Sequence, residues 1–182
     1  GVAGVIIFTS KILENGKEQG IGALFVDANT KGLRLGNPEK KMGWRGSDTR
    51  SIYFDEMRIP SANILGKPDK GFKQFLQTLT GGRISIAALS LGIAEAAYKA
   101  ALNYSNERAA FGKKINKFQS ISFKLADMAT QIEAARLLVY NTAWLKDQNK
   151  NIIKEAAMAK LFSSELAMKV TTEAIQILGG YG

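Results

Sequence analysis

Residues 118–148 read FQSISFKLADMATQIEAARLLVYNTAWLKDQ, and the spacing of their apolar side chains decides the fold. Apolar residues recur there at alternating intervals of four and three, which gives a helix one apolar face. Three long segments are helical in pattern: Phe72–Asn106, Phe118–Gln148 and Ile152–Leu178. Helices of this length, roughly 45 Å, pack as antiparallel neighbours in a bundle when short polar links join them. The apolar positions expected in the core are Ile121, Leu125, Met128, Ile132, Ala135 and Val139 in the second segment and Ala159, Leu166, Val170, Ala174 and Ile177 in the third.

The first 65 residues have the pattern of β-strands. Short runs of β-branched and aromatic residues are separated by polar turn residues, including Glu14-Asn15-Gly16-Lys17. Pro60 closes this block, because proline cannot continue a strand ladder. We therefore expect an α+β chain: residues 1–65 form part of an antiparallel β-domain, and residues 66–182 form three long helices of an incomplete four-helix bundle. The expected strands are Val2–Thr9, Ile21–Val26, Leu33–Leu35 and Arg50–Phe54.

Glycines mark two further places. Thr80-Gly81-Gly82 interrupts the first helical segment, at a cost of about 1 kcal/mol per glycine relative to alanine, so a bare backbone is expected to be needed there. Gly179-Gly180-Tyr181-Gly182 ends the sequence on a glycine turn, and we expect a fourth helix to follow it in a longer chain. The start, Gly1-Val2-Ala3-Gly4, has neither an initiator methionine nor a basic signal-peptide start.

The chain contains no cysteine and no histidine. Their absence excludes a disulfide framework, a thiolate nucleophile, a Cys/His zinc site and a Ser-His-Asp triad. No metal site is predicted. No uninterrupted apolar run reaches the roughly 18–20 residues that span a bilayer, so we expect no membrane partner.

Positive charge is concentrated in the second part of the chain. The formal net charge is +9. Residues 1–65 carry nine Lys/Arg and seven Asp/Glu, a net +2, whereas residues 66–182 carry sixteen and nine, a net +7. The net positive charge of residues 66–182 suits a polyanionic partner: nucleic acid, an acidic membrane surface or a small ligand with several phosphates. Nucleic acid is disfavoured, because the lysines are dispersed and no aromatics alternate with them. Most of these lysines are expected on solvated helix faces.

Four local patterns occur in a fixed order. Gly43–Thr49 (GWRGSDT) precedes a strand, and Gly81-Gly82-Arg83 precedes a helix of small residues. Glu107–Gly112 (ERAAFG) precedes Phe118-Gln119, and Gln176–Gly180 (QILGG) lies near the end. In this order and at these separations, the patterns closely resemble the acyl-CoA dehydrogenases, specifically the short-chain or butyryl-CoA-like branch. The resemblance would run from late in the central β-domain through three helices of the C-terminal bundle.

The resemblance implies a flavoenzyme that removes two hydrogens from the α and β carbons of a short- or medium-chain fatty acyl-CoA thioester. A carboxylate takes the α proton, FAD takes the β hydrogen as hydride, and the electrons pass to an electron-transfer flavoprotein. A homo-oligomer, usually a tetramer, is also implied. Two alternatives stay open: an acyl-CoA oxidase or flavin monooxygenase relative with the same fold, and a non-catalytic helical interaction module. A bacterial cytoplasm is the expected location, rather than a mitochondrial matrix.

The resemblance assigns two segments to the cofactor. Arg108 would contact the FAD pyrophosphate through paired charged hydrogen bonds, Phe111 would lie beside the cofactor, and Gln119 would meet the adenosine part. The last segment would touch the FAD of a neighbouring subunit, since glycines let a ligand approach the main chain. The structural alternatives are a helix cap for Arg108, a core plug for Phe111, a polar helix-start residue for Gln119 and an ordinary glycine cap for Gly179. The implied cofactor set is Arg108, Phe111, Gln119, Gln176, Ile177, Leu178, Gly179 and Gly180.

Thr80, Gly81, Gly82 and Arg83 would lie along the CoA moiety. The family commonly has aspartate where Thr80 stands, and a hydroxyl replaces one acceptor but not a negative charge. The isovaleryl-type branch carries its catalytic glutamate at the position of Gly82, and glycine cannot abstract a proton. The base is therefore implied to be a glutamate beyond Gly182, no catalytic residue is assigned within the chain, and these 182 residues alone are expected to be inactive.

Four carboxylates on the helical segments could be mistaken for a catalytic base. Each lies at helical spacing beside lysine or arginine, so solvated ion pairing is the expected role. They are Glu95, Glu107, Asp127 and Glu133.

Overall fold

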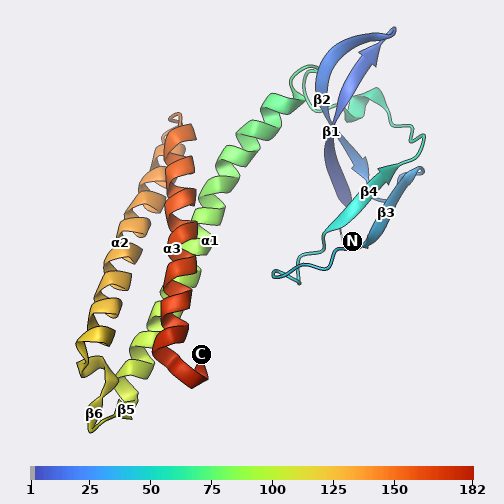
Figure 1. Ribbon diagram of the computed structural model, residues 1–182. Helices are drawn as coiled ribbons and strands as arrows, with labels where there is room; N and C mark the ends of the chain where they lie inside the picture. The colour runs from blue at the N-terminus through green and yellow to red at the C-terminus, as the bar shows by residue number, and fades with distance from the viewer. Residues whose placement is uncertain (1–2) are drawn as a thin grey trace. The chain divides into compact units, whose positions relative to one another are not determined.

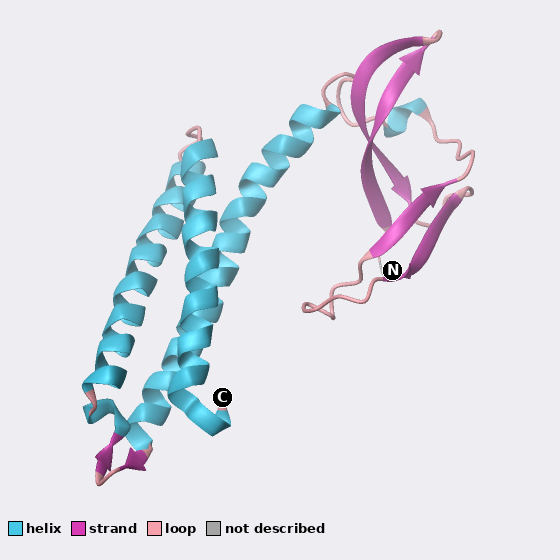
Figure 2. Cartoon of the chain, viewed as in Figure 1, coloured by secondary structure: helices cyan, strands magenta, loops and turns pink. Residues whose placement is uncertain are grey.

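The computed structural model describes residues 3–182 and contains both strands and helices, which confirms the α+β class (Figures 1 and 2). Two compact units divide the chain, the first ending at Gln77 and the second beginning at Thr78. The first unit holds the long strands, and the second holds a three-helix bundle.

Strands β1 (Val5–Glu14) and β2 (Lys17–Asp27) form an antiparallel hairpin. Asn15 and Gly16 connect them with positive φ angles of 50° and 76°, the conformation that two-residue hairpin turns favour. The predicted turn is therefore confirmed. The first strand was expected from Val2, which lies outside the described residues, to Thr9. It continues to Glu14 because β2 supplies a ladder partner at every step to Lys17.

Strands β3 (Leu33–Pro38) and β4 (Arg50–Phe54) form a second antiparallel ladder, separate from the first within residues 3–182. The rings of Phe8 and Phe54 lie 4.5 Å apart between their centroids, which links the two ladders. The buried apolar side chains of this unit belong to β2: Ala23, Leu24 and Val26.

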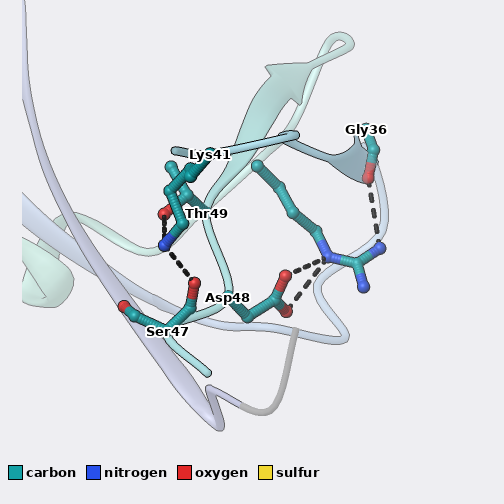
Figure 3. Close-up of polar contacts among 6 residues, drawn as sticks. Gly36, Lys41, Ser47, Asp48 and Thr49 are labelled. Atoms are coloured by element: carbon teal, nitrogen blue, oxygen red, sulfur yellow. Dashed lines mark hydrogen bonds and ion pairs between the residues drawn. The ribbon is translucent and has the colours of Figure 1, made fainter. Parts of the chain in front are cut away.

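Polar contacts hold the loop between β3 and β4 in place (Figure 3). The Lys41 ammonium donates to the Ser47 carbonyl oxygen and, at 3.0 Å, to Thr49 Oγ1. Arg50 Nε donates to the Asp48 carboxylate at 2.8 Å. Arg50 thus ties the loop to the start of β4.

Helices α1 (Gly71–Glu107), α2 (Gln119–Asp147) and α3 (Ile153–Leu178) agree closely with the three predicted segments. The expected interruption at Thr80-Gly81-Gly82 is wrong, because α1 runs through these residues without a break. Glycine lowers helix propensity but keeps its backbone hydrogen bonds, so a helix of 37 residues absorbs the cost.

The bundle core contains the predicted apolar stripes of α2 and α3, together with small residues of α1. Of the predicted positions, Ile121 is only partly buried and the others are buried. The α1 contribution is three alanines and a leucine, which lets the helices approach closely: Ala87, Leu91, Ala94 and Ala101.

Ion pairs join the helices outside this core. Arg136 of α2 pairs with Glu95 of α1 and with Glu133 of its own helix, and Lys124 of α2 pairs with Glu173 of α3. The hydrogen bond from Arg136 is the main cause that lowers the pKa of Glu95 below its ordinary value. The predicted ion-pairing role is confirmed for Glu95 and Glu133.

Helix α1 is, by length and composition, apolar enough to cross a membrane. One such helix is weak evidence of a membrane span, because a core helix of a soluble protein passes the same test. Helix α1 contributes four buried side chains to the core, and 22% of its apolar stretch is buried. The absence of a membrane partner stays a prediction.

Candidate functional site

A short hairpin connects α1 to α2 at one end of the bundle (Figure 1). Strands β5 (Ala109–Ala110) and β6 (Lys113–Lys114) pair antiparallel, and Phe111 and Gly112 form the turn with φ angles of 51° and 82°. The Phe111 side chain is 96% exposed, so the alternative of a core plug is wrong. Its ring lies nearly perpendicular to the Phe118 ring, with centroids 6.4 Å apart.

Arg108 lies between the end of α1 and the hairpin. Its N–H donates to the Tyr104 carbonyl at 2.8 Å, and its own carbonyl accepts from the Ile115 N–H at 3.0 Å. The side chain is exposed, and within residues 3–182 its guanidinium forms no ion pair. Fixed main-chain bonds and an unpaired guanidinium suit binding of an external anion.

Gln119 is the first residue of α2, and its side chain is exposed. Phe118, the residue before it, carries the Lys113 ammonium over its ring at 4.3 Å from the centroid. Lys113 was not singled out in the sequence, although a lysine directly after a Phe-Gly turn was a signal that could have identified it.

The end of α3 lies at the same end of the bundle as the hairpin. The rings of Tyr104, near the end of α1, and Tyr181, after α3, lie 6.1 Å apart. Gly179 ends α3 with φ 59°, and a Cβ at Gly179 or Gly180 would meet nothing within 4 Å. The space beside both glycines is therefore open, so a ligand could approach the main chain there without meeting a side chain.

The remaining residues of this segment divide between surface and core. Gln176 is exposed, whereas the Ile177 side chain is buried and Leu178 packs against the core. Ile177 could therefore offer a ligand only its main chain.

The predicted substrate residues lie near the other end of the bundle, on the wall of α1. A Cβ at Gly81 would lie 3.4 Å from Lys146 Nζ at the end of α2, while a Cβ at Gly82 would meet nothing within 4 Å. Arg83 is exposed and forms no ion pair within residues 3–182. From Arg83 to the end of α1 the helix rises about 36 Å.

A family model for the acyl-CoA dehydrogenase C-terminal domain matches residues 69–182. The chain belongs to the acyl-CoA dehydrogenase family. It is 57% identical over 162 residues to the probable acyl-CoA dehydrogenase YngJ of Bacillus subtilis, covering 89% of this chain and 43% of that protein. It is 51% identical over 178 residues to the short-chain specific mitochondrial acyl-CoA dehydrogenase of Homo sapiens, covering 98% of this chain and 42% of the relative.

Among solved structures, butyryl-CoA dehydrogenase from Megasphaera elsdenii matches this chain with a TM-score of 0.92 and 48% identity. The match covers 98% of this chain and 47% of that one. The chain thus spans less than half the length of these relatives.

The residues at the hairpin end fit the family's cofactor. An unpaired guanidinium complements a pyrophosphate, an exposed aromatic ring offers a flat apolar contact, and open glycine main chain permits close approach. Among the described residues, no group of three or more His, Cys, Asp or Glu side chains could hold a metal ion.

Proposed function

We propose that the full-length protein dehydrogenates a short- or medium-chain fatty acyl-CoA at its α and β carbons, with FAD as cofactor and an electron-transfer flavoprotein as acceptor. The observation that carries the proposal is the gathering of Arg108, Phe111, Gln119 and Gly179–Gly180 at one end of the bundle. The relatives named as short-chain specific and butyryl-CoA dehydrogenases support the substrate class.

In this proposal Arg108 holds the FAD pyrophosphate, Phe111 lies against the cofactor, and Gln119 hydrogen-bonds the adenosine part. Gln176 and the main chain of Gly179 and Gly180 complete the contact, with Ile177 and Leu178 supporting them from the core side. FAD, when bound, accepts the β hydrogen as hydride. The chain's own residues bind and orient it.

The separation of the two predicted sets supports a shared site between subunits. About 36 Å of helix lies between Arg83 and the hairpin end, a separation that favours two different sites over one compact site within the same subunit. We therefore propose that the hairpin end serves the FAD of a neighbouring subunit in a homo-oligomer, most simply the family's tetramer.

At the other end, Thr80, Gly81, Gly82 and Arg83 would line the CoA moiety. Arg83 has a free guanidinium for a phosphate or carbonyl, and Gly82 leaves open space for the ligand. The catalytic base is proposed to lie beyond Gly182.

Further parts of the proposal follow from the family. Residues 1–65 belong to the central β-domain and residues 66–182 to the helical domain, which the family model from residue 69 supports.

A solved structure described as an electron-transferring flavoprotein of Acidaminococcus fermentans, 47% identical with a TM-score of 0.93, supports the electron acceptor. The Bacillus and Megasphaera relatives support a bacterial cytoplasm. Neither nucleic acid nor a membrane is a proposed partner.

The test uses the full-length protein. It should be purified yellow, and anaerobic addition of butyryl-CoA should bleach the flavin absorbance. Acyl-CoAs of increasing chain length then define the preference, and air added after bleaching distinguishes a dehydrogenase from an oxidase. A flavoprotein that no acyl-CoA bleaches would contradict the proposal.

A further inference from the structure

The hairpin that carries Phe111 is too short to hold itself in place. Only two residue pairs form its ladder, Ala109 with Lys114 and Ala110 with Lys113. A two-stranded hairpin is marginal in water even when it is longer. In addition, Phe111 adopts a left-handed backbone conformation, which is unfavourable for a bulky residue. The position of the hairpin must therefore come from contacts at its base.

Two side-chain bonds tie that base to the last turns of α1. Asn116 lies in the single 3₁₀ turn Ile115–Lys117 that follows the hairpin, and its Nδ2 donates to Asn106 Oδ1 at 2.5 Å. Lys114 Nζ donates to the Glu107 carbonyl at 2.6 Å. The Asn106–Asn116 bond spans the whole hairpin, because the two residues flank it on either side.

The hydrogen bond between Asn106 and Asn116 has an energetic cost. Asn116 Oδ1 is buried and has no hydrogen-bond partner within residues 3–182. A buried acceptor without a protein partner lowers stability, so stability alone does not explain an asparagine at this position. An apolar side chain of the same size would fill this position without that penalty.

We propose that Asn116 is a positioning residue for the dinucleotide cofactor, acting through Asn106 to fix the hairpin that bears Arg108 and Phe111. The inference rests on the proposed cofactor role of those two residues. A hairpin fixed before binding loses less conformational freedom when the ligand arrives, so affinity rises without any direct contact from Asn116.

The experiment uses flavin-free full-length protein with the substitutions N116L, N106L and both together. We expect N116L to weaken FAD binding about 3- to 10-fold, by flavin fluorescence titration, while the unfolding temperature stays level or rises. Amide hydrogen exchange at Ile115, whose N–H donates to the Arg108 carbonyl, should become faster in the flavin-free variant. The double variant should bind FAD no more weakly than N116L, because both substitutions break one tie.

The matched control is N151L. Asn151 Oδ1 accepts from the Ile153 N–H at 3.2 Å at the opposite end of the bundle. This variant should leave FAD affinity unchanged.

Three outcomes separate the possibilities. FAD affinity of N116L equal to the wild type, or weakened no more than in N151L, overturns the positioning role. Unchanged FAD affinity in R108A contradicts the proposed function instead, and the positioning role with it. Unchanged exchange at Ile115 in N116L overturns the tie whatever the flavin titration gives.

Discussion

The two ends of the helical bundle are built differently. At the hairpin end, helix termini, a tight turn and a glycine turn converge, and the space beside Gly179 and Gly180 is open. At the other end, the predicted substrate residues lie on the continuous wall of α1, whose backbone groups bond within the helix. The glycine turn lets a ligand come close to the main chain. The surface of α1 instead offers a ligand its side chains and, at Gly82, open space.

The largest expected effect is a loss of stability of the bundle core, which supports both ends. Leu166 is 4% exposed in the bundle core, so Leu166→Ala should lower the free energy of unfolding by about 2–5 kcal/mol. Denaturant titration measures the loss. Met168→Ala is the control, because Met168 is 71% exposed on the same helix and should change stability by less than about 0.5 kcal/mol. Equal losses in the two variants would mean that the Leu166 side chain is not in the core.

Arg108→Ala should show that the two ends of the bundle bind different ligands. Loss of a charged hydrogen-bonding group from a phosphate costs about 1.5–3 kcal/mol, or roughly 10- to 150-fold in FAD affinity of the full-length protein. Fluorescence titration with FAD measures it. Arg83→Ala removes the same side chain from the wall of α1 and should leave flavin affinity unchanged. If both variants weaken flavin binding equally, the two ends do not serve different ligands.

Gly82→Ala tests whether the helix wall needs room. A Cβ there meets nothing within 4 Å, so the variant should gain up to about 1 kcal/mol of stability from helix propensity. In the full-length protein its KM for acyl-CoA should rise, because the new methyl group occupies the proposed ligand space. Gly81→Ala is the comparison: its Cβ would meet Lys146 instead, and KM should rise less. A more stable Gly82→Ala protein with wild-type KM would contradict a ligand at this position.

The smallest effect concerns the ion pair between α1 and α2. Because Arg136 lowers the pKa of Glu95, the folded state favours the charged carboxylate, and Glu95→Gln should cost roughly 0.5–1 kcal/mol at pH 7. This contribution is fully present above the ordinary value of 4.5 and disappears as pH falls through the lowered folded pKa. Urea unfolding of both proteins from pH 7 to pH 3 should therefore converge in acid. Glu133→Gln, at a more exposed partner of Arg136, should change stability less. A gap that widens in acid would reverse the assigned sign.

The helices and their buried faces were predictable because they depend on local periodicity. The stripe from Leu125 to Val139 is buried as its spacing requires, and the Asn15-Gly16 turn needs only two residues with positive φ. Prediction failed at Thr80–Gly82, where glycine propensity favoured a break but the length of α1 overrode it. For Phe111 the sequence left open a place beside the cofactor and a core plug, because a phenylalanine between helices is usually buried, and only the structure excluded the plug.

From its sequence alone this chain has an α+β class, three long amphipathic helices, and a family resemblance carried by motifs in order. Those features depend on residue type and spacing, which can be read directly from the amino-acid sequence. Only the tertiary structure brought Arg108 and Gly179 to one end of the bundle and separated them from Gly82 by most of the length of α1. Antiparallel packing of three helices decides which distant residues become neighbours, and that packing follows from the burial of their apolar faces together.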